Sequence, residues 1–194
     1  MKTINLTKIK KLDPCKHRLD NYIEHYKNRN FTIEQFLRLK KISHEDKLWV
    51  AFRMMPKKNL RFAAGEIALS VLSIFEKEFP KDSRPRKAIE LAMSEKVDRE
   101  AVKKAANDAY TAHAARADAA DSAAAYYAAR AARAAYYAAR AAYDAYDAAY
   151  SVYNAAYTAD ATCATYDAFY YAAETDNSKK QEKLQIDIVR KYWR

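Results

Sequence analysis

A stretch of 77 residues, from Asp98 to Glu174, contains neither Gly nor Pro. Alanine, the best helix former, dominates this stretch, so we expect it to be helical. One straight helix would be roughly 115 Å long at about 1.5 Å per residue. A compact chain of 194 residues has a radius of gyration of only about 16 Å. The helix should therefore fold back, and the best break is at residues 118–122, where Asp121 and Ser122 are good N-caps.

The rest of the chain also carries helix start and stop signals. Thr32 and Gln35 form a capping-box pattern, Ser43 and Asp98 are N-caps, and Pro56 and Pro80 end helices. The predicted helices run from Pro14 to about Asn28, from Thr32 through Leu39, from Ser43 to Pro56, from Leu60 to Phe79, from Arg86 to about Glu95, from Asp98 onward, and after Ser178. The predicted fold class is all-α, with short N-terminal helices packed on a long Ala-rich antiparallel helical hairpin or bundle.

Composition divides the chain into three parts, which we expect to form one continuous domain. Residues 1–104 are basic, with 25 Lys and Arg against 14 Asp and Glu; residues 105–177 are rich in Ala and Tyr; residues 178–194 form a C-terminal helix. The whole chain has a net charge of +10. Such a charge gives non-specific affinity for phosphate groups, so the basic N-terminal part is one candidate for nucleic-acid binding. Its basic residues include Lys8, Lys10, Lys11, Lys40, Lys41, Lys57, Lys58, Arg61, Lys81, Arg84, Arg86 and Lys87.

Small residues recur in the Ala-rich part at steps of three and four. The positions are 128, 131, 135, 138, 142, 145, 149, 152, 156 and 159, all Ala except Val152. This a/d-type seam predicts one long helix from about Ser122 to about Asp160 that approaches its neighbours closely. A seam of this kind can also join two copies of the chain, so a homo-oligomer is a further expectation. Cys163 continues the seam and is predicted to be a small packing residue.

Tyrosine rows accompany the seam. One row is spaced by seven and consists of Tyr136, Tyr143, Tyr150 and Tyr157. A tyrosine ring there can cover the seam while its hydroxyl reaches water or a partner. The pattern leaves open whether these rows are buried or exposed.

The opposite face combines Tyr with Arg. It comprises Tyr126, Arg130, Arg133, Tyr137 and Arg140, and continues with Asp144 and Asp147. Arg beside Tyr can hold a phosphate or carboxylate group, which makes this face a candidate site for a small anion or nucleotide. Two other interpretations remain: a solvated face with intrahelical ion pairs, or a face packed on the basic N-terminal helices.

No constellation of residues predicts catalysis. The four histidines show no metal-ligand spacing, and neither a P-loop nor a dinucleotide-binding motif is present. Cys15 stands two residues before His17 at a helix start, where we expect a buried cysteine rather than an activated thiol. The sequence therefore predicts a non-enzymatic protein without metal or cofactor. No segment predicts a signal peptide or a membrane span, so we expect a cytoplasmic protein.

Residues 78–90, EFPKDSRPRKAIE, resemble a motif of immunity proteins encoded at polymorphic-toxin loci. In that family an Ala-rich stretch follows, which is similar here to AYTAHAA at residues 109–115. The flanks resemble a related set of uncharacterised phage and prophage proteins, through Cys15, Lys47-Leu48-Trp49 and the final helix with Asp187-Ile188-Val189-Arg190-Lys191. The resemblance implies an all-α fold and a role in conflict between phage and bacterium or between bacteria. It supplies no catalytic residues.

These observations together predict a conflict protein of immunity or anti-defence type that binds and neutralises a protein effector. Tyr and Arg are common in interaction hot spots, so the Tyr rows are the expected interface. Binding of a small anion or nucleotide by the Tyr/Arg face, and nucleic-acid binding by the basic part, are the two alternatives.

Overall fold

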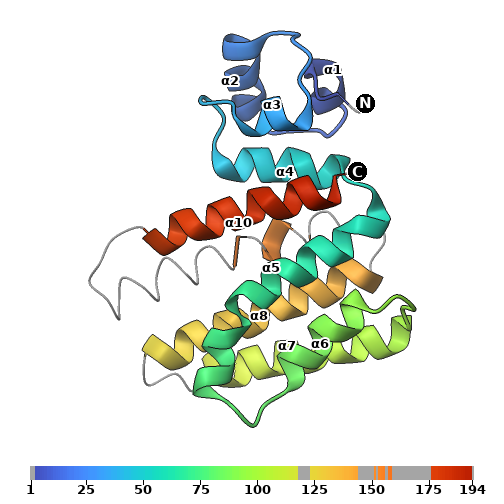
Figure 1. Cartoon of the computed structure of the whole chain (residues 1–194), viewed down its shortest axis with the longest axis vertical. Helices are drawn as coiled ribbons and strands as arrows, with labels where there is room; N and C mark the ends of the chain where they lie inside the picture. Colours follow the sequence, from blue (N-terminus) through green and yellow to red (C-terminus); the bar gives the residue numbers. More distant parts are fainter. Residues whose placement is uncertain are drawn as a thin grey trace.

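The protein is all-α in a computed structural model that describes residues 3–117, 123–143, 151, 153–155, 157–158 and 176–193 (Figure 1). Within these residues the only β structure is an isolated antiparallel bridge between Ile4 and Phe31. The named helices are α1 (Leu6–Lys10), α2 (Lys16–Tyr26), α3 (Ile33–Leu37), α4 (His44–Met54), α5 (Lys57–Glu78), α6 (Arg84–Met93), α7 (Arg99–Ala117), α8 (Ala123–Tyr143) and α10 (Asp176–Tyr192). None of the described helices is long and apolar enough to cross a membrane.

The N-caps predicted at Thr32, Ser43 and Asp98 form as expected. The Thr32 hydroxyl accepts from the Gln35 amide at 3.2 Å and the Gln35 side chain accepts from the Thr32 amide at 2.9 Å, which completes the capping box of α3. Ser43 caps α4 through the Asp46 amide, and the Asp98 carboxylate accepts from two amides at the start of α7. Because these caps satisfy amides that have no partner inside a helix, they fix where each helix begins.

Helix α1 was not expected from the sequence. It spans only five residues, too few for an apolar periodicity to be visible. Tertiary and capping contacts hold it instead: the Asn5 side chain accepts from the Lys8 amide, and Ile4 exchanges two backbone hydrogen bonds with Phe31. The N-terminal segment is thereby fixed to the loop after α2.

The helices form successive layers (Figure 1). Helices α1 to α3 lie at one end of the molecule, α4 lies below them, and α10 packs on α4 and α5. Helix α8 packs against three helices, α5, α6 and α7. The colour gradient of Figure 1 runs in opposite directions along α7 and α8, which form the predicted antiparallel Ala-rich hairpin.

The predicted break at residues 118–122 falls between α7 and α8, although these five residues lie outside the described part. The predicted long helix is described as far as Tyr143. Its continuation toward Asp160 is helical at residues 151, 153–155 and 157–158, and the positions between them lie outside the described residues. Asp144, Asp147 and Cys163 also lie there.

The buried surface of α8 is wider than the predicted seam. The seam positions Ala131, Ala135 and Ala138 are fully buried. Four alanines beside the seam are buried as well: Ala132, Ala134 and Ala139 completely, and Ala141 nearly so. A seam of one stripe would face one neighbour, whereas α8 packs against three helices. Packing within the chain therefore occupies this part of the seam, which a second copy could reach only by displacing helices of this chain.

The chain's one glycine marks a close approach between α5 and α6. A Cβ atom built on Gly65, in the middle of α5, would overlap Cγ and Sδ of Met93 at the end of α6. Glycine lowers the stability of a helix by about 1 kcal/mol relative to alanine. The Met93 side chain explains why this helix carries it.

Candidate functional site

The predicted Tyr/Arg residues of α8 are only partly gathered by the fold. Arg133 is exposed, whereas Arg130, Arg140, Tyr136 and Tyr137 are half-buried. Of the other predicted residues, Tyr126 and Tyr143 lie in α8 but their side chains are outside the described part, and Tyr150 lies outside it altogether. The question whether the Tyr rows are buried or exposed thus has a mixed answer, because Tyr157 is 58% exposed.

Two arginines of α8 stack on two different tyrosines. The Arg133 guanidinium donates to the Tyr137 hydroxyl at 3.2 Å and lies 5.6 Å from the centre of that ring. The Arg140 guanidinium instead lies 5.9 Å from the ring centre of Tyr136, which the sequence assigned to the other row. The two arginines therefore do not converge on one anion through a shared aromatic stack.

A tyrosine of α7 joins this group. The ring of Tyr110 is 5.2 Å from that of Tyr136, which in turn is 5.1 Å from that of Tyr137. Tyr110 is 51% exposed. We call Tyr110, Arg133, Tyr136, Tyr137 and Arg140 the Tyr/Arg surface. Sequence reasoning missed Tyr110 because heptad spacing within one helix carries no information about which residue of the next helix lies beside it.

Several of the basic N-terminal residues have partners within the chain. Lys8 donates to the Thr3 carbonyl at 2.6 Å, and Arg61 donates to the carbonyl groups of Ala92 and Ser94 at the end of α6. Arg84 forms two side-chain hydrogen bonds with Asp82, and Arg86 forms two with Glu76. These charges are therefore partly committed to the fold, which weakens the case for a phosphate-binding surface built from them.

The same contacts explain the motif at residues 78–90. Asp82 and Arg84 pair within the turn, Arg86 ties α6 to α5 through Glu76, and Ala88 and Ile89 are fully buried. The hydrogen bonds raise the pKa of Arg86 and lower the pKa of Glu76. The motif thus builds an α5–α6 hairpin.

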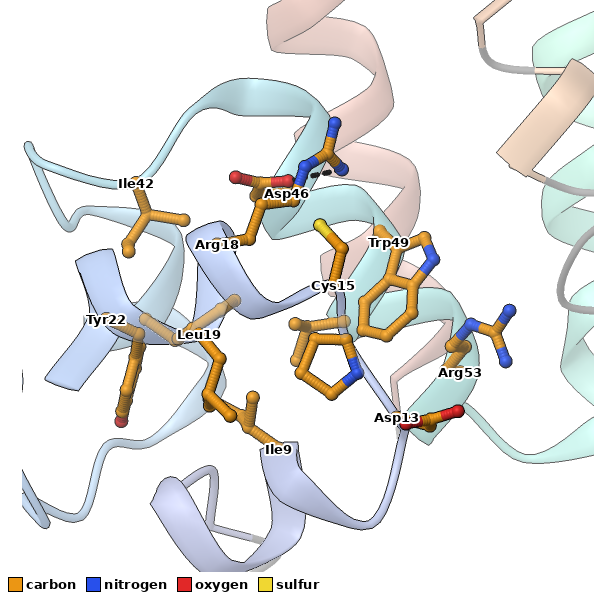
Figure 2. A pocket seen from close by; sticks show the side chains of 13 residues that line it. Ile9, Asp13, Cys15, Arg18, Leu19, Tyr22, Ile42, Asp46, Trp49 and Arg53 are labelled. Atoms are coloured by element: carbon orange, nitrogen blue, oxygen red, sulfur yellow. Dashed lines mark ion pairs between the residues drawn. The ribbon is translucent and has the colours of Figure 1, made fainter.

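A pocket of about 300 Å³ opens between α1, α2 and α4, with α3 at its floor (Figure 2). We call it the N-terminal pocket. Its apolar lining comprises Ile9, Pro14, Leu19, Phe36, Ile42, Trp49 and Val50. The floor is deep, because Phe36 is only 1% exposed and Val50 only 6%. A concave, mainly apolar space of this size with a few polar groups is typical of small-molecule sites.

Tyr22 on α2 brings a buried hydroxyl to this lining. The residue is 3% exposed, and no described residue hydrogen-bonds its hydroxyl oxygen. Burial and the neighbouring Tyr26 raise the pKa of Tyr22 to about 12, so it stays neutral under physiological conditions. A buried hydroxyl without a partner is uncommon and destabilises the fold.

The mouth of the pocket is charged. Arg18 and Asp46 form an ion pair of 2.6 Å. The Arg53 guanidinium stacks 4.6 Å from the ring centre of Trp49. Figure 2 shows Trp49, Arg53 and Asp13 along one side of the pocket and Tyr22 and Ile42 along the other.

Cys15 also lines the mouth, and the expectation that it is buried is wrong. It is the N-cap residue of α2 and is exposed, with its Sγ atom 3.6 Å from Nδ1 of His17. The reason is that the turn at Asp13 and Pro14 carries the chain around the rim of the pocket before α2 begins. No pattern in the sequence indicates the pocket, because its lining comes from four helices and the segments between them. No group of three His, Cys, Asp or Glu side chains suited to a metal ion occurs among the described residues.

Comparison with known proteins gives no match: no family model, curated protein or solved structure is significantly similar to this chain.

Proposed function

We propose that the protein is a non-enzymatic conflict protein of immunity or anti-defence type, which binds and neutralises a protein effector through the Tyr/Arg surface. The observation that carries this proposal is the cluster of ring contacts across α7 and α8 formed by Tyr110, Tyr136 and Tyr137 with two arginines. The resemblance of residues 78–90 and of the flanking segments to immunity and phage proteins supports the role in conflict.

Stacking prepares these side chains for binding. Immobilising a flexible side chain on association costs about 0.5–1.5 kcal/mol, and Arg133 is already held by the ring and hydroxyl of Tyr137. Tyr and Arg at the centre of an interface commonly act as hot spots. Arg133 forms no ion pair with a described residue, so a carboxylate of the effector is its natural partner.

The alternative, capture of a nucleotide by Tyr126, Arg130, Arg133, Tyr137 and Arg140, has weaker support. Arg133 and Arg140 stack on different rings, so they do not form one anion clamp. Nucleic-acid binding through the N-terminal part is weakened by the internal partners of Arg61, Arg84 and Arg86.

The experiment mixes the purified protein with a panel of toxins and defence nucleases and follows complex formation by size-exclusion chromatography and calorimetry. We expect one effector to form a complex whose Kd rises at least thirtyfold in Tyr110→Ala and at least tenfold in Arg133→Ala. Arg38→Ala is the matched control, because Arg38 is an exposed arginine at the C-cap of α3, and α3 lies away from α8 in the fold (Figure 1).

Absence of a complex with every effector would overturn the proposal, as would a complex whose Kd is the same in all three variants. A nucleotide panel and a DNA duplex measured in parallel identify the alternatives. Tight binding of either ligand that depends on Arg133, without an effector complex, would replace the proposed function.

A further inference from the structure

The N-terminal pocket is a second candidate site, and it shares neither a residue nor a helix with the Tyr/Arg surface. It is built by α1, α2, α3 and α4, whereas the Tyr/Arg surface lies on α7 and α8. Its floor reaches the core: Ile9, Phe36 and Ile42 are all less than a tenth exposed. A recess of this depth suits the body of a small molecule better than the flat surface of a protein.

The charges at the mouth narrow the class of ligand. Arg18 and Asp46 neutralise each other as an ion pair. Of the remaining charged lining residues, Asp13 and Arg53 have no ion-pair partner among the described residues. The mouth thus offers one unpaired anion and one unpaired cation beside an apolar recess, which is complementary to a ligand that carries both charges and an apolar body.

The backbone holds Asp13 at this place. Its φ angle is +55°, in the left-handed region that non-glycine residues seldom adopt, and its amide donates to the Lys10 carbonyl at 3.2 Å. Residues held in such conformations are concentrated at ligand sites. Arg53 is likewise held, because its guanidinium stacks on the Trp49 ring.

We propose that the N-terminal pocket binds a free amino acid with an apolar or aromatic side chain. Asp13 takes the α-ammonium group, Arg53 takes the α-carboxylate, and the side chain enters the recess beside Trp49 above Phe36. An amino acid carries its ammonium and carboxylate groups on the same carbon atom, so it can bind Asp13 and Arg53 together at the mouth of the pocket. The recess selects for size and apolarity, and the mouth selects against amines and acids that carry only one charge.

Calorimetry with L-phenylalanine, L-leucine and L-methionine tests this proposal. We expect binding of at least one of them, L-phenylalanine being the main probe. Three analogues remove one feature each: 3-phenylpropionate lacks the ammonium group, L-phenylalaninamide lacks the carboxylate, and L-alanine lacks the large side chain. Each should bind at least tenfold more weakly.

Two variants remove one charge of the mouth each. Asp13→Asn keeps a residue type that tolerates positive φ, and Arg53→Met keeps an apolar stem beside Trp49. Both should raise the Kd for L-phenylalanine at least tenfold with thermal unfolding unchanged. Arg29→Met is the matched control, because Arg29 also stacks on an aromatic ring, that of Phe31, away from the pocket. It should change the Kd less than twofold.

Cys15 supplies an independent readout, since it is exposed at the mouth. Bound L-phenylalanine should slow the alkylation of Cys15, measured by mass spectrometry of its peptide, several-fold in the unmodified protein and not in Arg53→Met. No binding of any of the three amino acids would overturn the proposal. Equal affinity for 3-phenylpropionate and L-phenylalanine, or an equal loss in Arg29→Met and Arg53→Met, would overturn it as well. Tyr110→Ala should leave amino-acid binding intact, so the outcome is independent of the proposed function.

Discussion

The N-terminal helices pack through large side chains, whereas the α7–α8 hairpin packs mainly through small ones. Around α4 the core is made of large residues such as Phe36, Leu48 and Phe52, whereas the buried side chains described on α8 itself are all alanine. Large side chains extend far from the backbone and can leave a recess where they meet, and the N-terminal pocket lies there. Alanine lets helices approach closely, so stability comes from many small contacts. The two regions should therefore respond oppositely to changes in side-chain size.

Truncation should damage the N-terminal core most. Phe52 is fully buried, so Phe52→Ala should lower the free energy of unfolding by about 3–5 kcal/mol through lost burial and a new cavity. The matched truncation in the hairpin, Ala135→Gly, removes only a methyl group and should cost about 1 kcal/mol. Urea unfolding followed by circular dichroism measures both. Equal losses in the two variants would contradict the contrast between the regions.

Enlargement should damage the hairpin instead. Ala138 is fully buried on α8, and Ala138→Leu should lower the free energy of unfolding by about 1–3 kcal/mol, because the neighbouring helices must move apart. Val50→Ile adds one methylene beside the N-terminal pocket and should leave the stability within about 0.5 kcal/mol of the original. Thermal unfolding of the two variants distinguishes them. A harmless Ala138→Leu would show that α8 is loosely packed.

The single glycine tests close packing between α5 and α6. Gly65→Ala gains helix propensity but forces Met93 to move, and we expect a net loss of about 1 kcal/mol. In the Met93→Ala background the obstacle is absent, so the same substitution should become stabilising by a similar amount. A double-mutant cycle of unfolding free energies measures this reversal of sign. Additive effects would mean that Met93 is not the obstacle.

The smallest expected effect concerns the hydroxyl of Tyr22. Because no described residue hydrogen-bonds this buried hydroxyl, Tyr22→Phe should raise the free energy of unfolding by about 1 kcal/mol. The pKa of Tyr22 rises from 10.0 to about 12 in the folded state, so the unfolded chain loses this proton first and stability falls as pH rises through that interval. The variant should lose less stability than the original protein between pH 10 and 12.

Alkaline unfolding curves of the two proteins provide the measurement for Tyr22. The exposed Tyr157 supplies the control, since Tyr157→Phe removes a hydroxyl that is not buried and should leave the stability unchanged. A parallel loss in Tyr22→Phe and the original protein would show that this hydroxyl does not titrate as a buried group.

The sequence predicted the helical class and most helix starts, because caps such as Thr32, Ser43 and Asp98 act over three residues. It did not predict α1, which depends on the bridge between Ile4 and Phe31. It also placed Tyr136 and Tyr137 on separate faces, although their rings lie 5.1 Å apart and Tyr110 of α7 lies beside them. The N-terminal pocket was not foreseen either, since Asp13, Tyr22 and Arg53 come together only in the tertiary fold.

Helix α10 makes polar contacts with residues that lie far from it in the sequence. Arg190 forms an ion pair with Glu34 at 3.0 Å. The Gln185 side chain forms a hydrogen bond of 2.8 Å with the His44 ring, and the Tyr192 hydroxyl donates to Glu66 at 2.6 Å. These contacts span 126 to 156 residues of sequence. Contacts of such separation slow folding, because a long loop must close before they form. During translation, the core between α3, α4 and α5 is therefore completed only when α10 packs on these helices. We expect the protein to become resistant to proteases only after this helix has left the ribosome.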